Sequence, residues 1–443
     1  MFFGSISMSR KQLLIRGTLV LTFTGFLSRF MGFFYRIFLS RTFGSEGVGL
    51  YQLIFPVYAL CYSLTTAGIE TAISRSVACK ISLKKKNEAR QTLSAGLLIA
   101  LFSSCLCTLA LQQYADFISI TLLHEERCSS LLTILSYTLP FSAVHSCICG
   151  YSYGQKGTKI PARSQLIEQS MRILSVYLLY NFFLRQGKSV SISIAVCGLV
   201  IGEMFSALYS FHAISKKEPT LGRIHLSFQG FRTHAHELLT LSVPLTANRV
   251  LINLLQSIEA VSIPTRLQLY RFTTSEALSI YGVLNGMALP CILFPSAITS
   301  SVSVMLLPTV AELQAAENRN KLRDIVKKSI SACFLLGLFC CLFFLLFGSF
   351  IGITLFGSKT AGQFIVTLAW ICPFLYTNSA LLSIINGLGR TGTTFLINAF
   401  GLLIRIGSVF FAIPFWGIQG YLWGLLISQL CVTLLAGRNI FRK

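Results

Sequence analysis

Two arginines lie inside an apolar stretch near the start of the sequence, where a charge serves either ligand binding or helix packing. Steps of four, three and four place four residues on one face of a helix: Gly25, Arg29, Gly32 and Arg36. A charge near the bilayer centre costs at least about 2.5 to 3.5 kcal/mol, so such arginines usually face a protein interior or a water-filled cavity. We therefore expect Arg29 to be a cation that lines a cavity. Arg36 lies nearer the helix end, where a long side chain also reaches the membrane interface.

A second polar stripe occupies the apolar segment near residues 238–262. Its members are Asn248, Arg249, Asn253, Gln256 and Glu259. Two such stripes that faced each other would enclose a hydrated, charged cavity near the middle of the membrane. The alternative is that these groups pair to lock helices together, although such bonds are worth only about 1 kcal/mol each.

The sequence repeats itself after 230 positions. Five residues recur at this offset, since Arg36, Arg41, Ser45, Glu46 and Tyr51 correspond to Arg266, Arg271, Ser275, Glu276 and Tyr281. Self-similarity at one fixed offset indicates a duplicated unit, which is common in transporters. The same offset aligns Arg29 with Glu259, so the two copies differ where a charge would matter most.

Other polar residues interrupt the apolar segments. Asn285, followed by Pro290 and Pro295, predicts a broken or kinked helix that could form a gate, because proline removes a backbone hydrogen bond. Single charged or titratable residues elsewhere, namely Glu70, His145, Arg172, Glu203 and Arg405, are expected to be interior groups. We expect His145 to be a hydrogen-bonded interhelical group rather than a proton relay.

Composition restricts the class of protein. Of the 443 residues 53% are hydrophobic and only 12% are charged, which indicates a polytopic all-α membrane protein with about twelve transmembrane helices. The net charge of +22 does not indicate nucleic-acid binding, because the basic residues lie mostly in short loops between apolar segments. We find no catalytic motif or metal-ligand spacing, and the cysteines lie mostly in apolar segments as small hydrophobes. We therefore expect no catalytic residues, metal or nucleic-acid partner.

The basic residues also predict how the chain is threaded. Lysine and arginine favour cytoplasmic loops, and their distribution places both termini in the cytoplasm. The repeat then predicts two six-helix lobes, residues 1–230 and 231–443, related by an axis along the membrane normal.

Several segments resemble one known family. Ser28, Arg29 and Gly32, with the following Arg36 and the Phe43-Gly44 turn before Gly49, resemble the first helix of the multidrug/oligosaccharidyl-lipid/polysaccharide (MOP) exporter superfamily. The segments 67–74, 263–267 and 280–290 are similar to its stage V sporulation protein B and polysaccharide-biosynthesis branch, which is related to lipid II flippases.

This resemblance implies a function and a set of site residues. It implies a flippase of a bacterial inner membrane that moves an undecaprenyl-diphosphate-linked sugar or peptidoglycan precursor by alternating access. Arg29 matches the position of a cation that holds the diphosphate, and an arginine can bind phosphate oxygens with two parallel hydrogen bonds. The remaining candidates for the central cavity are Arg36, Arg249, Asn253, Gln256, Glu259 and Asn285.

Partners, energy coupling and alternatives complete the expectation. We expect a lipid-linked sugar and membrane lipids as partners, with cell-wall synthases as further candidates. We expect no cofactor, with coupling to the membrane potential, Na⁺ or H⁺. Glu259 could either neutralise Arg29 or bind the coupling cation. Two alternative functions are a cation-coupled multidrug exporter of the same fold and a membrane-embedded polysaccharide polymerase.

Overall fold

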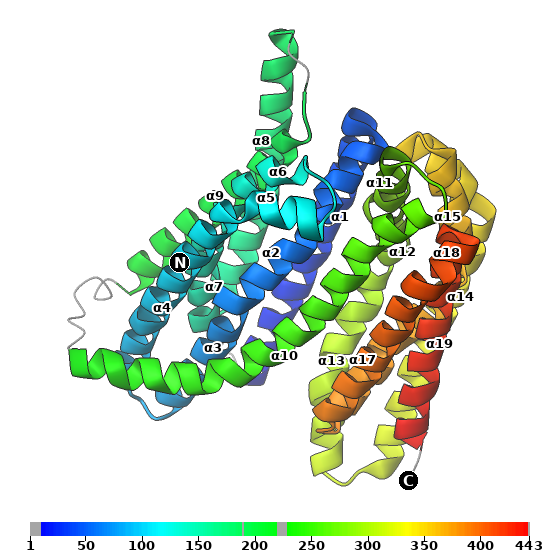
Figure 1. Ribbon diagram of the computed structural model, residues 1–443. Coiled ribbons are helices and arrows are strands. Elements are labelled where there is room, and N and C mark those ends of the chain that lie inside the picture. Colours follow the sequence, from blue (N-terminus) through cyan, green and yellow to red (C-terminus); the bar gives the residue numbers. More distant parts are fainter. Residues whose placement is uncertain (1–9, 188–189, 219–227, 442–443) are drawn as a thin grey trace, which may run out of the picture. The chain divides into compact units, whose positions relative to one another are not determined.

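Every regular element in the described part of the chain is a helix. The computed structural model describes residues 10–187, 190–218 and 228–441 (Figure 1). Within these residues ten helices are long and apolar enough to cross a membrane, or eleven if one bent pair, Lys359–Ala369 with Cys372–Gly387, forms a single span. The prediction of an all-α polytopic membrane protein is confirmed.

The number of spans differs from the predicted twelve for three local reasons. Two predicted spans form one continuous helical run, Val20–Ser82, of 63 residues. Helix α8, Lys159–Arg185, carries Glu168, Arg172 and several uncharged polar residues, and it is not apolar enough to be counted. Conversely, the apolar segment 277–308, which we expected to form one span, divides into two counted helices, Thr274–Leu293 and Ser296–Gln314.

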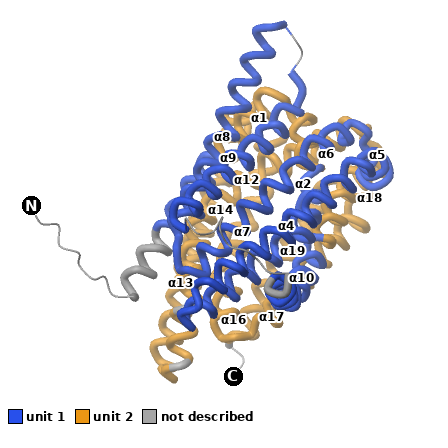
Figure 2. The backbone as a smooth tube through the Cα atoms, turned by 90° about the vertical axis from the view of Figure 1, so that its left-hand side faces the viewer, with its two compact units in different colours: residues 1–32, 54–253 blue, residues 33–53, 254–443 orange. Residues whose placement is uncertain are grey.

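The chain packs into two compact units, each treated separately below (Figure 2). Unit 1 comprises Met1–Gly32 and Ile54–Asn253, and unit 2 comprises Phe33–Leu53 and Leu254–Lys443. Two long helices, α1 (Arg10–Leu53) and α10 (Phe228–Leu269), each contribute to both units. The predicted lobes 1–230 and 231–443 describe the sequence repeat and remain a prediction.

Unit 1 is built around a cluster of buried apolar side chains. Its core includes Ile73, Val77, Leu93, Cys147 and Leu238. The helices after α1 are α2 (Phe55–Tyr62), a π-helical turn (Ser63–Ala67), α3 (Gly68–Ser82), α4 (Lys86–Gln113), α5 (Ala115–Phe117), a π-helical turn (Ile118–Leu122), α6 (Cys128–Ser136), α7 (Thr138–Gly154), α8 and α9 (Ser193–Lys217).

Unit 2 contains the end of α1, the second part of α10 and the remaining helices. These are α11 (Thr274–Gly282), a π-helical turn (Val283–Ala288), α12 (Leu289–Leu293), α13 (Ser296–Ala315), α14 (Arg319–Phe356), α15 (Lys359–Ala369), α16 (Cys372–Gly387), α17 (Thr391–Gly407), a π-helical turn (Ser408–Ala412), α18 (Ile413–Trp416) and α19 (Ile418–Phe441). Buried residues of its core include Leu306, Val310 and Ile384.

The structure confirms the broken helix that the prolines predict. The π-helical turn Val283–Ala288 lies directly before Pro290, and α12 ends at Leu293, two residues before Pro295. Each proline lacks a backbone N–H, so the carbonyls in the preceding turn lose their usual donor and the helix widens or breaks. Whether this break is a gate remains a prediction.

The two copies of the repeated motif pack against each other inside unit 2. Helix α1 kinks at Gly44, whose φ of 70° suits glycine, and the following turn crosses α11. Ser45 and Ser279 share a hydrogen bond between their hydroxyls, and a Cβ on Gly282 would lie 2.6 Å from the Gly49 backbone nitrogen. Glycines at both positions therefore allow the two backbones to touch, as small residues do in membrane helix pairs.

We predict that Gly282→Leu destabilises unit 2 strongly, because the new side chain would have to separate two backbones rather than displace a flexible side chain. The measurement is the thermal unfolding midpoint of the purified chain in detergent. Gly392→Leu is the matched control, because a Cβ at Gly392 meets no atom within 4 Å. An equal loss in both variants would contradict close packing at Gly282.

Candidate functional site

Three of the seven predicted cavity residues belong to unit 1. Arg29 is exposed on α1, although the surrounding helix is apolar. Arg249 is also exposed, and its Nη2 donates to Thr71 Oγ1 on α3 over 3.1 Å. Asn253 Nδ2 donates to the Ala59 carbonyl at 3.3 Å and to Ser63 Oγ, which ties α10 to the start of the first π-helical turn. Within unit 1, Arg249 and Asn253 thus hold α10 to its neighbours.

The other four predicted residues belong to unit 2. Arg36 Nη1 donates to the backbone carbonyl of Asn285 over 3.1 Å, so the structure brings these two residues together. This carbonyl lies in the π-helical turn before Pro290, where the widened backbone leaves acceptors for a side chain. Gln256 is exposed on α10. A single cavity that all seven residues share remains a prediction.

Glu259 has a specific partner in unit 2. Its side chain is buried, and one carboxylate oxygen accepts hydrogen bonds from Arg405 Nε and the Tyr421 hydroxyl, both at 2.7 Å. The ion pair joins α10 to α17, and Tyr421 adds a contact to α19. A buried carboxylate needs such partners because its desolvation would otherwise cost several kcal/mol. In unit 2, Arg405 therefore already neutralises the charge of Glu259.

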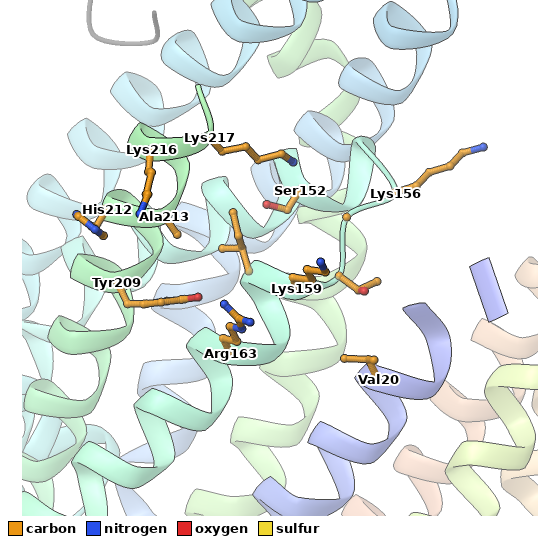
Figure 3. Close-up of a pocket in the computed structure, with 13 residues that line it drawn as sticks. Val20, Ser152, Lys156, Lys159, Arg163, Tyr209, His212, Ala213, Lys216 and Lys217 are labelled. Carbon is orange, nitrogen blue, oxygen red and sulfur yellow. The ribbon is translucent and has the colours of Figure 1, made fainter. Parts of the chain in front are cut away.

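Unit 1 contains a large cavity where three helices end (Figure 3). Its volume is about 790 Å³, and it lies at the end of α7, the start of α8 and the end of α9. Several basic side chains line it, including Lys159, Arg163 and Lys216, and none of its described lining residues is acidic. By sequence these residues belong to the basic loops that are expected in the cytoplasm, and nothing in their spacing predicts that they share a cavity.

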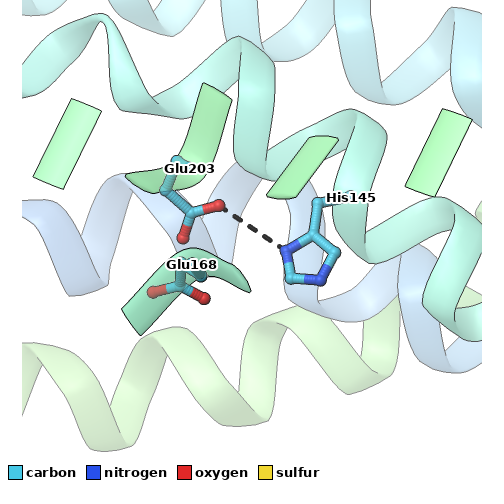
Figure 4. A group of neighbouring side chains, drawn as sticks. All are labelled: His145, Glu168 and Glu203. Carbon is cyan, nitrogen blue, oxygen red and sulfur yellow. Dashed lines mark ion pairs between the residues drawn. The ribbon is translucent and has the colours of Figure 1, made fainter. Parts of the chain in front are cut away.

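A second cavity of unit 1, of about 330 Å³, is acidic. His145 from α7, Glu168 from α8 and Glu203 from α9 meet there, with their nitrogen and oxygen atoms all within 4.8 Å of one another (Figure 4). His145 Nδ1 lies 3.6 Å from Glu203 Oε2, and its Nε2 is 2.9 Å from Ser164 Oγ. Arg172 pairs with Glu168 one helical turn away.

Charged groups of both signs surround this acidic cavity. Glu70 also lines it, so three carboxylates face two arginines, Arg172 beside Glu168 and Arg249 near Glu70. With His145 neutral one negative charge remains, so the arrangement suits a proton or a small cation. The three ligand atoms could also contact a metal ion, although Arg172 already occupies Glu168.

Sequence reasoning found most of these residues but not the group they form. His145, Arg172 and Glu203 were treated as separate interior groups, and Glu168 was missed. The spacing of Glu168 and Arg172, four apart on a predicted helix, was an available signal for a local ion pair. The prediction that His145 has an interhelical hydrogen-bond partner agrees with its contact to Ser164.

Comparisons with known proteins place the chain in a family. The model of the family of polysaccharide biosynthesis proteins matches residues 14–314, and the chain belongs to this family. It is 28% identical to stage V sporulation protein B of Bacillus subtilis (strain 168) over 434 residues, 97% of this chain and 84% of that protein. It is 27% identical to the lipid II flippase MurJ of the same organism over 201 residues, 43% of this chain and 37% of that protein.

Solved structures show the same fold. A multidrug resistance MATE family transporter of the MOP superfamily, in an inward-facing conformation, matches with a TM-score of 0.72 and 14% identity, covering 95% of this chain and 96% of that one. A MOP superfamily transporter from Pyrococcus furiosus matches with a TM-score of 0.66 and 14% identity, covering 96% and 94%. The family match confirms the polysaccharide-biosynthesis branch inferred from the sequence, and the solved structures show that the chain has the fold of MOP superfamily transporters.

We predict that the Glu259–Arg405 pair stabilises unit 2 as a pair and not residue by residue. Glu259→Leu alone leaves the half-buried Arg405 without its carboxylate and should cost at most about 3 to 5 kcal/mol. Glu259→Leu combined with Arg405→Met removes both charges and should be clearly less destabilising than either single change. Unfolding of the three variants in detergent measures this coupling, and additive losses would contradict it.

Proposed function

We propose that this protein is a flippase that moves an undecaprenyl-diphosphate-linked oligosaccharide or peptidoglycan precursor across a bacterial inner membrane. The observation that carries the proposal is Arg29, an exposed guanidinium on an apolar helix of a chain with the MOP transporter fold. The similarity to a protein named lipid II flippase and the membership of the polysaccharide biosynthesis family support this substrate class.

The proposed mechanism rests on charge. A diphosphate cannot enter lipid uncompensated, because buried charge is costly unless it is paired. Arg29 supplies a planar group of donors for phosphate oxygens, and Arg249 of the same unit is a second candidate cation. Alternating access then exposes the bound headgroup to one side of the membrane at a time, with both termini in the cytoplasm and cell-wall synthases receiving the product.

In this proposal, the cation that drives transport binds in the acidic cavity of unit 1. Glu259 is already held by Arg405 and Tyr421, whereas the acidic cavity around His145, Glu168 and Glu203 has one excess negative charge when His145 is neutral. A proton or Na⁺ that enters this cavity neutralises the excess. The membrane potential contributes as well, since one elementary charge moved through 100 mV is worth about 2.3 kcal/mol.

A cation-coupled exporter of small molecules is the second candidate function. The acidic cavity favours it, because a buried carboxylate that takes up a cation suits ion-driven export. The multidrug resistance MATE family transporter that has the same fold supports the same class. The two functions differ in the charge and size of the cargo, which makes them separable by transport measurements.

We predict that Arg29→Ala lowers the rate of transbilayer movement of a fluorescent undecaprenyl-diphosphate sugar at least about ten-fold, as expected when one charge-assisted contact to phosphate is lost. The measurement is quenching of outer-leaflet fluorescence in proteoliposomes with equal amounts of inserted protein. Lys359→Ala removes an exposed cation elsewhere and is the control. Unchanged movement in Arg29→Ala would remove this residue from the site. Transport of a cationic dye, without movement of any lipid-linked sugar, would establish the second candidate instead.

We predict that Glu203→Gln abolishes the response of transport to an imposed proton or Na⁺ gradient while lipid movement without a gradient persists. The substitution keeps the shape of the side chain and removes the charge opposite His145. The rate of lipid movement is compared with and without each gradient, using the exposed Glu126→Gln as the control. A gradient response that survives in Glu203→Gln would exclude this cavity as the coupling site.

A further inference from the structure

The basic cavity of unit 1 lies at one level of the unit, where membrane-crossing helices end. Helix α7 ends at Gly154, α8 begins at Lys159 and α9 ends at Lys217, and side chains from all three line the cavity. Val20 of α1 adds an apolar wall, together with Ile160 and Ala213. The cavity therefore combines an apolar surface with the ends of spans, which is the position of the membrane interface.

Cations dominate the rim of this cavity. Six basic residues line it: Lys156, Lys159, Arg163, His212, Lys216 and Lys217. Lys159, Arg163 and the Tyr209 hydroxyl point toward the middle of the cavity, whereas Lys156 extends away from it (Figure 3). The cavity thus offers ammonium, guanidinium and hydroxyl donors to a single acceptor group.

These cations lack the acidic partners that other cations of unit 1 have. Lys80 pairs with Glu237 at 2.7 Å, Lys85 pairs with Glu88 at 2.9 Å, and Arg90 pairs with Glu218. By contrast, across the described ranges no ion pair involves the four cavity residues Lys156, Lys159, Arg163 and Lys216.

Glu218, the carboxylate next to the cavity residues in sequence, already has partners of its own. Glu218 follows Lys217 directly, yet it accepts hydrogen bonds from Arg90 and, over 3.3 Å, from Gln155 Nε2. Lys217 itself donates to Gln155 Oε1. Glu218 and Gln155 are therefore occupied by Arg90 and Lys217. The cavity residues Lys159, Arg163 and Lys216 can bind another anion.

We propose that this cavity binds the phosphate headgroup of an anionic membrane phospholipid. Basic pockets between membrane helices bind such headgroups, and each lysine or arginine near an anionic membrane surface contributes about 1 kcal/mol. The phosphate accepts from Lys159, Arg163 and Lys216, while an acyl chain follows the apolar wall that Val20, Ile160 and Ala213 form. A free phosphate ion would contact the basic side chains but not the apolar wall. This site is separate from Arg29 and does not depend on the proposed transport function.

The test compares lipid binding by two matched variants of the full-length chain. Lys159→Gln/Arg163→Gln/Lys216→Gln removes two lysines and one arginine from the cavity. Lys327→Gln/Lys328→Gln/Arg323→Gln removes the same charges from the exposed start of α14 in unit 2. Native mass spectrometry counts phosphatidylglycerol and phosphatidylcholine bound to each protein, and size-exclusion chromatography verifies that each variant is folded.

We expect the native chain and the α14 variant to retain phosphatidylglycerol in preference to phosphatidylcholine. The cavity variant should bind phosphatidylglycerol about ten-fold more weakly or worse, with no change for phosphatidylcholine. Equal losses in both variants would show a general charge effect and overturn the proposal. Displacement of the lipid by millimolar inorganic phosphate would assign the cavity to a free anion. Selective binding of undecaprenyl diphosphate in place of phosphatidylglycerol would assign it to the transported lipid.

Discussion

The cost of an ionised group in an apolar surrounding governs how this chain is built. Charged residues are few, and inside the helices they are found in two states. Some are held by partners within one unit, as Glu259 is by Arg405 and Tyr421. Others, such as Arg29, are exposed on helices that are otherwise apolar. Buried pairs of the first kind join helices, and exposed groups of the second kind can be reached by water or a ligand.

Unit 1 carries both signs of charge in separate cavities. The basic cavity at the helix ends and the acidic cavity around His145 are both lined by residues of α7, α8 and α9. Segregation of this kind keeps an anion-binding surface from being neutralised by nearby carboxylates. It also means that a cation and an anion can occupy one unit without competing for the same donors and acceptors.

The fold was predictable because its signals are local, whereas the grouping of side chains was not. The length of the apolar segments predicts the helices, and Pro290 and Pro295 predict the broken helix. The fixed offset of 230 positions predicts the repeat. The Glu259–Arg405 pair joins residues 146 apart, and the sequence offered no rule for matching one interior charge with another. Glu168 was not predicted, because Arg172 was interpreted as a single interior charge and not as one half of an ion pair. Three-dimensional contacts between distant helices, rather than helix propensity, decided these cases.

The close crossing of α1 and α11 has a consequence for biogenesis. The segment 33–53 is made early, yet its packing partners in unit 2 include Ser279, which is 234 residues away from Ser45. At synthesis rates of about 5 to 20 residues per second, the glycine-lined surface waits for roughly 10 to 50 s before its partner exists. During that interval this segment must be sheltered by lipid or by the insertion machinery. Synthesis of α11 therefore sets the earliest moment at which the segment 33–53 reaches its final contacts.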